Sequence, residues 1–221
     1  MTERTDSQRV PALVPTTGKV VLGIDPGTLK LGWGVIVFEG SKVRRLASGV
    51  LRPSSREPRA VRLGILLQQL TELFDAHRPH AVAVETAFVR TDPRAALVLG
   101  EARGLPMALG ASRGIAVLEL SPSEVKRAVV GQGRATKEQV QEMVRIQLRL
   151  DALPAEDEAD ALAIALTAML QLRPLGVQAA KAPGPTPVLA RAAAQDPPAM
   201  TSGRAYYAAV LAAARGRKGS R

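Results

Sequence analysis

Three β-rich segments follow one another in the first quarter of the chain, joined by short connections. They are KVVLGID at 19–25, GWGVIVF at 32–38 and KVRRLASGVL at 42–51. The connections are too short for the crossover of about a dozen residues that a parallel pair requires, so the segments are predicted to be consecutive antiparallel strands. Any fold proposed for the chain must therefore contain these three consecutive antiparallel strands.

Helical and strand patterns alternate after residue 51. Apolar residues at helical spacing predict a helix over 59–77, and AVAVE at 81–85 predicts a strand behind it. A helix between two strands implies a crossover and a parallel partner. A second such pair is predicted at 93–112 and 114–120. The prediction is therefore a mixed α/β sheet of five strands, three antiparallel and then parallel, flanked by helices.

Three more helices are predicted from local signals. Ser121-x-x-Glu124 and Thr136-x-x-Gln139 have the spacing of capping boxes, in which a hydroxyl and an acid or amide side chain satisfy the free amides of a helix start. An Ala-rich segment over about 155–170 predicts the last helix.

The ordered region is predicted to span 19–172, between a flexible segment at 1–18 and a basic Ala/Pro-rich tail at 173–221 that we expect to be disordered. The net charge of +10 favours a polyanionic partner. From Leu172 onward, however, eight basic residues and one acid carry +7, which leaves +3 for the rest. Charge alone is therefore a weak argument for nucleic acid.

The absence of cysteine excludes disulfides, thiolate metal sites and cysteine nucleophiles. The only two histidines, His77 and His80, are interpreted as surface residues, so a metal must be held by oxygen ligands. The sequence has neither a signal-peptide pattern nor an apolar stretch long enough to span a bilayer, and it predicts a cytoplasmic protein with no membrane partner.

Two carboxylates end predicted strands. Asp25 follows a buried strand in GIDPG, and Glu85 closes AVAVE. Side-chain alternation places Asp25 on the face of Gly23, and Glu85 on the face of Ala83. Both faces carry small residues, so a helix backbone can approach them closely. The last helix offers a matching small surface in Ala159, Ala161, Ala163 and Ala165.

Asp157 and Asp160 lie on one side of that last helix, so four acids are expected to meet. Clustered carboxylates repel one another unless hard cations neutralise them, which favours Mg²⁺ or Mn²⁺, and two such ions can act together in phosphoryl displacement. Acids at a helix start also simply complement the helix dipole. The residues alone do not decide which of Glu156, Asp157, Glu158 and Asp160 faces the site.

Residues 19–172 resemble the RuvC Holliday junction resolvases. The blocks that carry the resemblance are GIDPGTLKLGWGV at 23–35, VETAF at 84–88, ALVLGEARG at 96–104, EVKRAVVGQGRATKEQVQEMV at 124–144 and EDEADALAIALTA at 156–168. All four acids fall within these blocks, in the order of the family.

The resemblance implies an RNase H-like nuclease domain, a homodimer and metal-dependent nicking of two opposed strands of a four-way DNA junction, which leaves 5′-phosphate and 3′-hydroxyl ends. It assigns Asp25, Glu85, Asp157 and Asp160 as catalytic metal ligands. The resemblance also implies a function in DNA recombination and repair. It implies a location in the bacterial cytoplasm, at the nucleoid when the enzyme is active. A branch-migration complex of the RuvA/RuvB type is a further candidate partner.

The resemblance also assigns DNA contacts. It gives this role to Lys126 and Lys137, although the residues alone favour a solvated helix face for both. It makes Phe88 the aromatic that wedges into the junction, whereas the residues alone would equally let Phe88 cap a minor core. The following loop, VRTDPR at 89–94, departs from the family, with Asp92-Pro93 where an Asn is usual.

Because of this departure, Arg90 and Arg94 are predicted to contact phosphates instead. Trp33 stands where a tyrosine is commoner and is interpreted as a core residue.

Three other functions would each account for part of this pattern. GIDPGT followed by GWG also resembles the phosphate-binding hairpin of actin, chaperone ATPases and sugar kinases, but the chain has no room for their second domain. A related nuclease of ribosomal RNA precursors would lack the Lys126/Lys137 block. A junction-binding protein without catalysis would not need intact acids.

Overall fold

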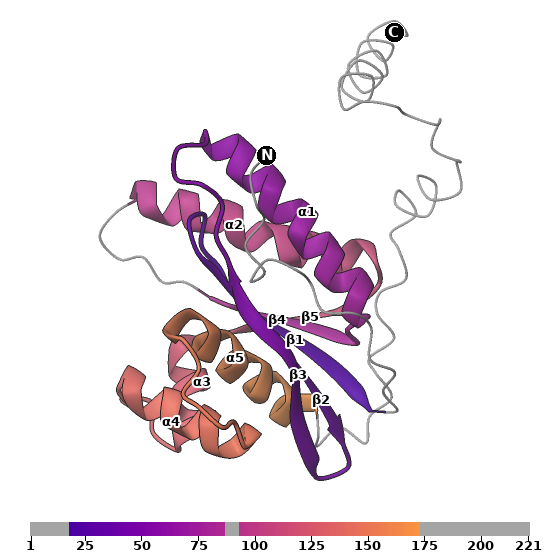
Figure 1. The fold of residues 1–221 in the computed structure, drawn as a ribbon, viewed down its shortest axis with the longest axis vertical. Helices are drawn as coiled ribbons and strands as arrows, with labels where there is room; N and C mark the ends of the chain where they lie inside the picture. The colour runs from indigo at the N-terminus through magenta and orange to yellow at the C-terminus, as the bar shows by residue number, and fades with distance from the viewer. Residues whose placement is uncertain (1–17, 87–92, 173–221) are drawn as a thin grey trace, which may run out of the picture. The chain divides into compact units, whose positions relative to one another are not determined.

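The computed structural model describes residues 18–86 and 93–172, and within them one five-stranded sheet in the order β3-β2-β1-β4-β5 (Figure 1). The strands are β1 (Lys19–Asp25), β2 (Leu31–Glu39), β3 (Lys42–Leu51), β4 (Ala81–Glu85) and β5 (Ala116–Leu120). The helices are α1 (Arg59–His77), α2 (Pro93–Ser112), α3 (Pro122–Val130), α4 (Lys137–Leu148) and α5 (Glu156–Leu172). β1, β2 and β3 pair antiparallel, and β4 pairs parallel with β1 and β5, so the predicted mixed sheet is confirmed.

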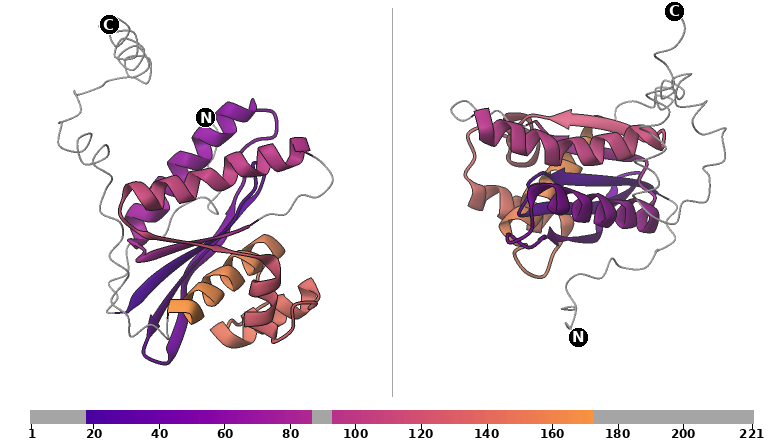
Figure 2. Two further views of the ribbon diagram at one scale, coloured as in Figure 1. Left: turned by 180° about the vertical axis from the view of Figure 1, so that it is seen from behind. Right: turned by 90° about the horizontal axis from the view of Figure 1, so that it is seen from above.

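Helices cover both faces of the sheet. Figures 1 and 2 show α1 and α2 together on one face, and α5 with α3 and α4 on the other. Each face has its own apolar core. Leu22 and Ile24 of β1 belong to the α1 and α2 side, whereas Val21 belongs to the α5 side. Side chains alternate along a strand, so Gly23 and Asp25 also face α5.

The backbone of α5 lies against the small residues of this face. A Cβ atom added to Gly23 would lie 2.1 Å from the carbonyl oxygen of Ala161, and one added to Gly34 would lie 2.7 Å from the side chain of Leu162. Gly23 and Gly34 are partners in the β1–β2 ladder. The predicted close approach of an Ala-rich helix is confirmed, and it depends on the missing side chains.

Both predicted capping boxes are present. The Ser121 amide donates to the Glu124 carboxylate at 2.7 Å, while the Ser121 hydroxyl accepts from the Glu124 amide at 3.3 Å. The Thr136 amide likewise donates to the Gln139 side chain at 2.9 Å. These contacts satisfy free amides at the helix starts and fix where α3 and α4 begin.

The prediction that His77 lies on the surface is wrong. His77 is only 9% exposed, and its ring centroid lies 6.2 Å from that of Trp33, which is buried as predicted. Burial lowers the pKa of His77. His80 is exposed as predicted, but its Nδ1 accepts a hydrogen bond from the Val20 amide at 3.0 Å.

Smaller differences concern element ends. β5 begins at Ala116 rather than at residue 114, because Gly114 adopts a positive φ of 68° and the Ile115 amide donates to the Gly110 carbonyl at the end of α2. The predictions of a flexible segment at 1–18 and a disordered tail at 173–221 fall almost wholly outside the described residues. In the part of the chain that the structure describes, no helix is long and apolar enough to cross a membrane.

Candidate active site

Asp25 and Glu85 end neighbouring parallel strands. β1 and β4 pair in the register Ile24 with Val84, so the two acids follow directly at the same edge of the sheet. Both side chains are largely buried. The carboxyl edge of the sheet therefore presents two carboxylates on adjacent strands.

Gly32 brings the start of α5 to this edge. Gly32 is the ladder partner of Asp25, and a Cβ atom added to it would lie 2.0 Å from the backbone carbonyl oxygen of Asp157. A residue with a side chain could not stand there without moving α5. The start of α5, which carries Asp157 in its first turn and Asp160 just after it, therefore lies beside Asp25.

The predicted acids line one pocket of about 360 Å³. Its lining residues are Asp25, Glu85, Asp157, Asp160, Glu156, Lys126, Lys137, Pro122, Val125 and Val140. β1, β4, α3, α4 and α5 all contribute to it. The structure thus brings together four acids and two lysines that the sequence analysis singled out separately.

The pKa values of the pocket acids reflect their burial first and the crowding of negative charge second. Burial, and then the charges of Asp160, Glu85 and Asp157, raise the pKa of Asp25 from 3.8 to about 7, against a smaller opposing effect of Lys137. Burial and the Asp160 charge also raise the pKa of Glu85. Without a cation in the pocket, at least one carboxylate is therefore prone to hold a proton near neutral pH.

The two lysines offset part of this charge. Burial raises the pKa of Asp160, while Lys137 and Lys126 lower it. Lys137 itself forms an ion pair with the exposed Glu156, and this hydrogen bond raises the pKa of the Lys137 ammonium. Both lysines are thus electrostatically coupled to the acids.

The donor set fits a hard divalent cation. Carboxylate oxygens are the ligands that Mg²⁺ and Mn²⁺ prefer, and a bound cation would counter both the burial and the repulsion that raise the carboxylate pKa values. Among the described residues, no three Asp, Glu, His or Cys side chains stand in an arrangement that could hold an ion. Metal binding therefore requires the carboxylates to turn toward one another.

Glu158, which the sequence left as a candidate, does not line the pocket. The Ser48 hydroxyl of β3 donates to its carboxylate, and Arg45 Nη1 lies 3.4 Å from its Oε1. Glu156 does line the pocket, although the resemblance does not assign it as a metal ligand. Of the four acids at the start of α5, Glu158 is therefore the one that contacts side chains within the edge strand β3.

Two arginines near the acids were missed by the sequence analysis. Arg103 of α2 donates from Nε to the backbone carbonyl of Glu85 at 3.1 Å and forms an ion pair with Glu119. Arg52, just after β3, places Nη2 at 3.5 Å from Asp157 Oδ2. Arg103 lies in the ALVLGEARG block, one of those that carry the family resemblance, whereas no sequence motif includes Arg52.

The remaining predicted DNA contacts lie away from the pocket or outside the described residues. Arg94 is exposed near the start of α2 and does not line the pocket. Phe88 and Arg90 lie outside the described residues, as does Asp92. The predicted roles of these residues stay predictions.

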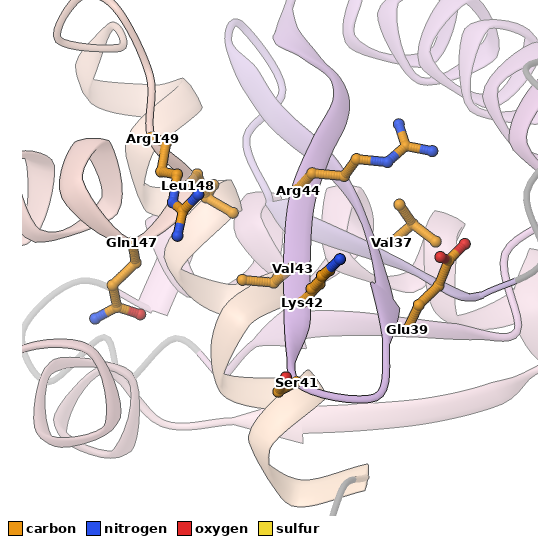
Figure 3. A pocket seen from close by; sticks show the side chains of 9 residues that line it. All are labelled: Val37, Glu39, Ser41, Lys42, Val43, Arg44, Gln147, Leu148 and Arg149. Atoms are coloured by element: carbon orange, nitrogen blue, oxygen red, sulfur yellow. The ribbon is translucent and has the colours of Figure 1, made fainter.

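A larger hollow, of about 560 Å³, lies at the other end of the sheet around the β2–β3 turn. In Figure 3, Val43 points toward Leu148 on the α4 side of β3, whereas Arg44 lies across the strand with Val37. Arg149, at the end of α4, is on the Val43 side. The cations of this hollow do not converge on one point, so the smaller acidic pocket is the better candidate despite its size.

Comparison with known proteins places the chain in a family. A family model described as "Crossover junction endodeoxyribonuclease RuvC" matches residues 21–168, which include all four acids and both lysines. The chain belongs to the RuvC family. Its fold is accordingly RNase H-like, and the match ends four residues before α5 does.

A RuvC relative from Alkalilimnicola ehrlichii is 50% identical over 147 residues, which cover 66% of this chain and 88% of the relative. The structure of Thermus thermophilus RuvC matches with a TM-score of 0.65 and 40% identity, over 70% of this chain and 95% of that one. The same protein in complex with a Holliday junction substrate matches with a TM-score of 0.67 and 39% identity, over the same shares.

Proposed function

We propose that the protein is a Holliday junction resolving endonuclease that acts in DNA recombination and repair. The family is named for crossover junction endodeoxyribonucleases, which hydrolyse DNA phosphodiester bonds, and its nucleases depend on a metal. The observation that supports catalysis by this chain is its pocket, which four carboxylates from three elements line, and where burial together with the charges of the other three acids raises the pKa of Asp25 to about 7.

Asp25, Glu85, Asp157 and Asp160 are proposed to hold two Mg²⁺ or Mn²⁺ ions. When bound, such ions lower the pKa of water and stabilise the leaving oxygen of an in-line displacement at phosphorus. The protein's part is to keep four oxygen ligands at one sheet edge. The parallel register of β1 and β4 places Asp25 and Glu85 side by side. The close contact at Gly32 positions the start of α5, and with it Asp157 and Asp160, next to them.

Lys126 and Lys137 are proposed to bind the DNA backbone beside the acids. Both line the pocket, and both carry positive charge into a site that must receive a phosphate. The Lys137 pair with Glu156 is exposed, and exposed pairs are worth about 0–1 kcal/mol, so an incoming phosphate can replace Glu156 at little cost. Phe88, Arg90 and Arg94 are proposed to extend this contact along the junction.

Two opposed strands must be cut to resolve a junction, and one chain supplies one pocket of this kind in its described part. A homodimer that presents two such pockets to the two strands would leave paired nicks with 5′-phosphate and 3′-hydroxyl ends. We therefore propose a homodimer as the active form. A branch-migration complex of the RuvA/RuvB type is a further proposed partner.

The test incubates the protein with a synthetic four-way junction, a linear duplex and a structured RNA, each with and without Mg²⁺ or Mn²⁺. Symmetric nicks are expected on the junction alone and only with metal. Asp25→Asn and Glu85→Gln should abolish cutting while junction binding survives, because these acids hold metal and do not grip DNA.

Glu158→Gln is the matched control. Glu158 lies in the same turn of α5 as Asp157 but contacts β3 outside the pocket, so this variant should cut normally. Normal cutting by Asp25→Asn or Glu85→Gln would refute the assignment of that residue. Equal cutting of duplex and junction would refute the proposed substrate.

A further inference from the structure

Arg52 brings a third cation to the acids from a different side of the fold. It directly follows β3, whose Val50 pairs with Gly32, the ladder partner of Asp25. Arg52 therefore lies at the same sheet edge as the acids. The two lysines of the pocket come instead from α3 and α4.

The Arg52 side chain contacts one of the proposed metal ligands. Its Nη2 lies 3.5 Å from Asp157 Oδ2, and Arg52 does not itself line the pocket. A guanidinium beside Asp157 disfavours a divalent cation on the same carboxylate, because the two positive charges repel each other. Arg52 therefore competes with any ion that Asp157 receives.

This contact is easy to break. The Arg52 side chain is 50% exposed, and an exposed pair at 3.5 Å contributes little because water screens it. The backbone, by contrast, is fixed: Leu51 and Pro53 on either side are buried, and a residue before proline favours an extended conformation. The guanidinium can thus turn away from Asp157 while its Cα stays in place.

A planar guanidinium that leaves a carboxylate is well suited to a phosphate, which it can bind through two parallel N–H donors. We propose that Arg52 pairs with Asp157 in the metal-free protein and moves to a phosphate of the bound DNA strand when metal takes up Asp157. This inference rests on the proposed function, because it assumes both the metal and the DNA.

The chain offers a matched control for Arg52. Arg45, within β3, lies 3.4 Å from Glu158 and is 42% exposed. Arg45 and Arg52 thus pair with adjacent acids of the same helical turn at similar distance and exposure. They differ in that Asp157 lines the pocket, whereas Glu158 lies outside it and also accepts a hydrogen bond from Ser48.

The first experiment titrates Mn²⁺ into the DNA-free protein and follows it by electron paramagnetic resonance. Arg52→Gln removes the competing charge and should tighten Mn²⁺ binding about 2- to 5-fold, the size expected for the loss of one exposed pair. Arg45→Gln should bind Mn²⁺ as the wild type does. Unchanged or weaker Mn²⁺ binding by Arg52→Gln would overturn the proposed competition.

The second experiment measures junction binding against salt concentration, in EDTA and in Ca²⁺, with gels to verify that the junction is uncut. In EDTA, Arg52→Gln should bind only slightly more weakly than Arg45→Gln does, since a metal-free Asp157 still attracts Arg52 and offsets part of its contact with phosphate. In Ca²⁺, it should bind several-fold more weakly, and its salt slope should fall by about one phosphate contact. Equal slopes for the two variants in Ca²⁺ would overturn the proposed move to phosphate.

The wild type separates the two levels of failure. If the wild type binds neither Mn²⁺ nor the junction, the proposed function itself is wrong. If the wild type binds both and cuts, but Arg52→Gln behaves as Arg45→Gln does throughout, only the role of Arg52 is wrong. Arg52→Lys should keep the wild-type Mn²⁺ affinity and recover part of the Ca²⁺-dependent binding, because it keeps the charge and loses the planar fork.

Discussion

Replacing Asp25 by Asn should make the metal-free protein more stable while it abolishes cutting. The folded protein holds the proton of Asp25 up to about pH 7, whereas an ordinary aspartate loses it near 3.8. The folded state is therefore not penalised below pH 3.8, and it loses stability as the pH rises from there to about 7. Asparagine is neutral at every pH and avoids this loss.

The size of the effect follows from the same values. A gap of about 3 pH units between folded and unfolded states corresponds to at most roughly 4 kcal/mol at pH 8. The carboxylates of the metal-free pocket can turn apart, and an effective dielectric constant near 20 weakens their repulsion, so we expect about 1–3 kcal/mol to be gained. Near pH 4 the gain should vanish, because both forms are then neutral.

Urea denaturation in EDTA at a series of pH values measures this gain. The free energy of unfolding of Asp25→Asn minus that of the wild type should rise between pH 4 and 8. Mg²⁺ should reverse the order, because ligand binding stabilises only the protein that keeps its ligands. Asp151→Asn, an exposed acid in the connection before α5, should show neither effect. A pH-independent difference, or an unstable Asp25→Asn in EDTA, would refute the electrostatic reasoning.

Three further variants test other parts of the structure. Gly32→Ala should destabilise the fold by about 1–3 kcal/mol and weaken Mn²⁺ binding, because its Cβ meets the Asp157 carbonyl; thermal melting and Mn²⁺ titration measure both. Lys126→Ala should lower the salt slope of junction binding by about one phosphate contact, whereas Lys42→Ala at the far hairpin should not. His77→Leu should gain stability over the wild type as the pH falls below 6.5, because burial disfavours the charged imidazole; a difference constant with pH would contradict this.

Local patterns were sufficient to predict most of the fold. The predicted helices at 59–77 and 93–112 agree with α1 and α2 at both ends, and both capping boxes start the helices that they were expected to start. These features depend on neighbours within a few residues, which a sequence displays directly. The assignment of His77 to the surface went wrong although the same kind of pattern was available. Leu70, Leu73, Phe74 and His77 form one buried stripe of α1 at helical spacing.

The site was only partly predictable. The strand-end positions of Asp25 and Glu85 and the small residues on their face were enough to expect an acidic cluster against the last helix. The contacts of Arg52 with Asp157, and of Arg103 with Glu85, join residues far apart in the sequence. Their geometry depends on how β3 and α2 approach the carboxyl edge. No spacing rule within one element contains that information.

The distribution of apolar and acidic residues along α5 explains how the fold tolerates the cluster of four acids. Residues 161–169 of this helix are all buried, so its later turns hold it between the sheet and the helices α3 and α4. Its first turn contributes little to this core and carries Glu156, Asp157 and Glu158 instead. The positive end of the helix dipole also favours negative charge there. Stability and charge repulsion thus reside in different turns of one helix. The pocket can therefore keep its acids crowded for a cation without loss of the packing that places them.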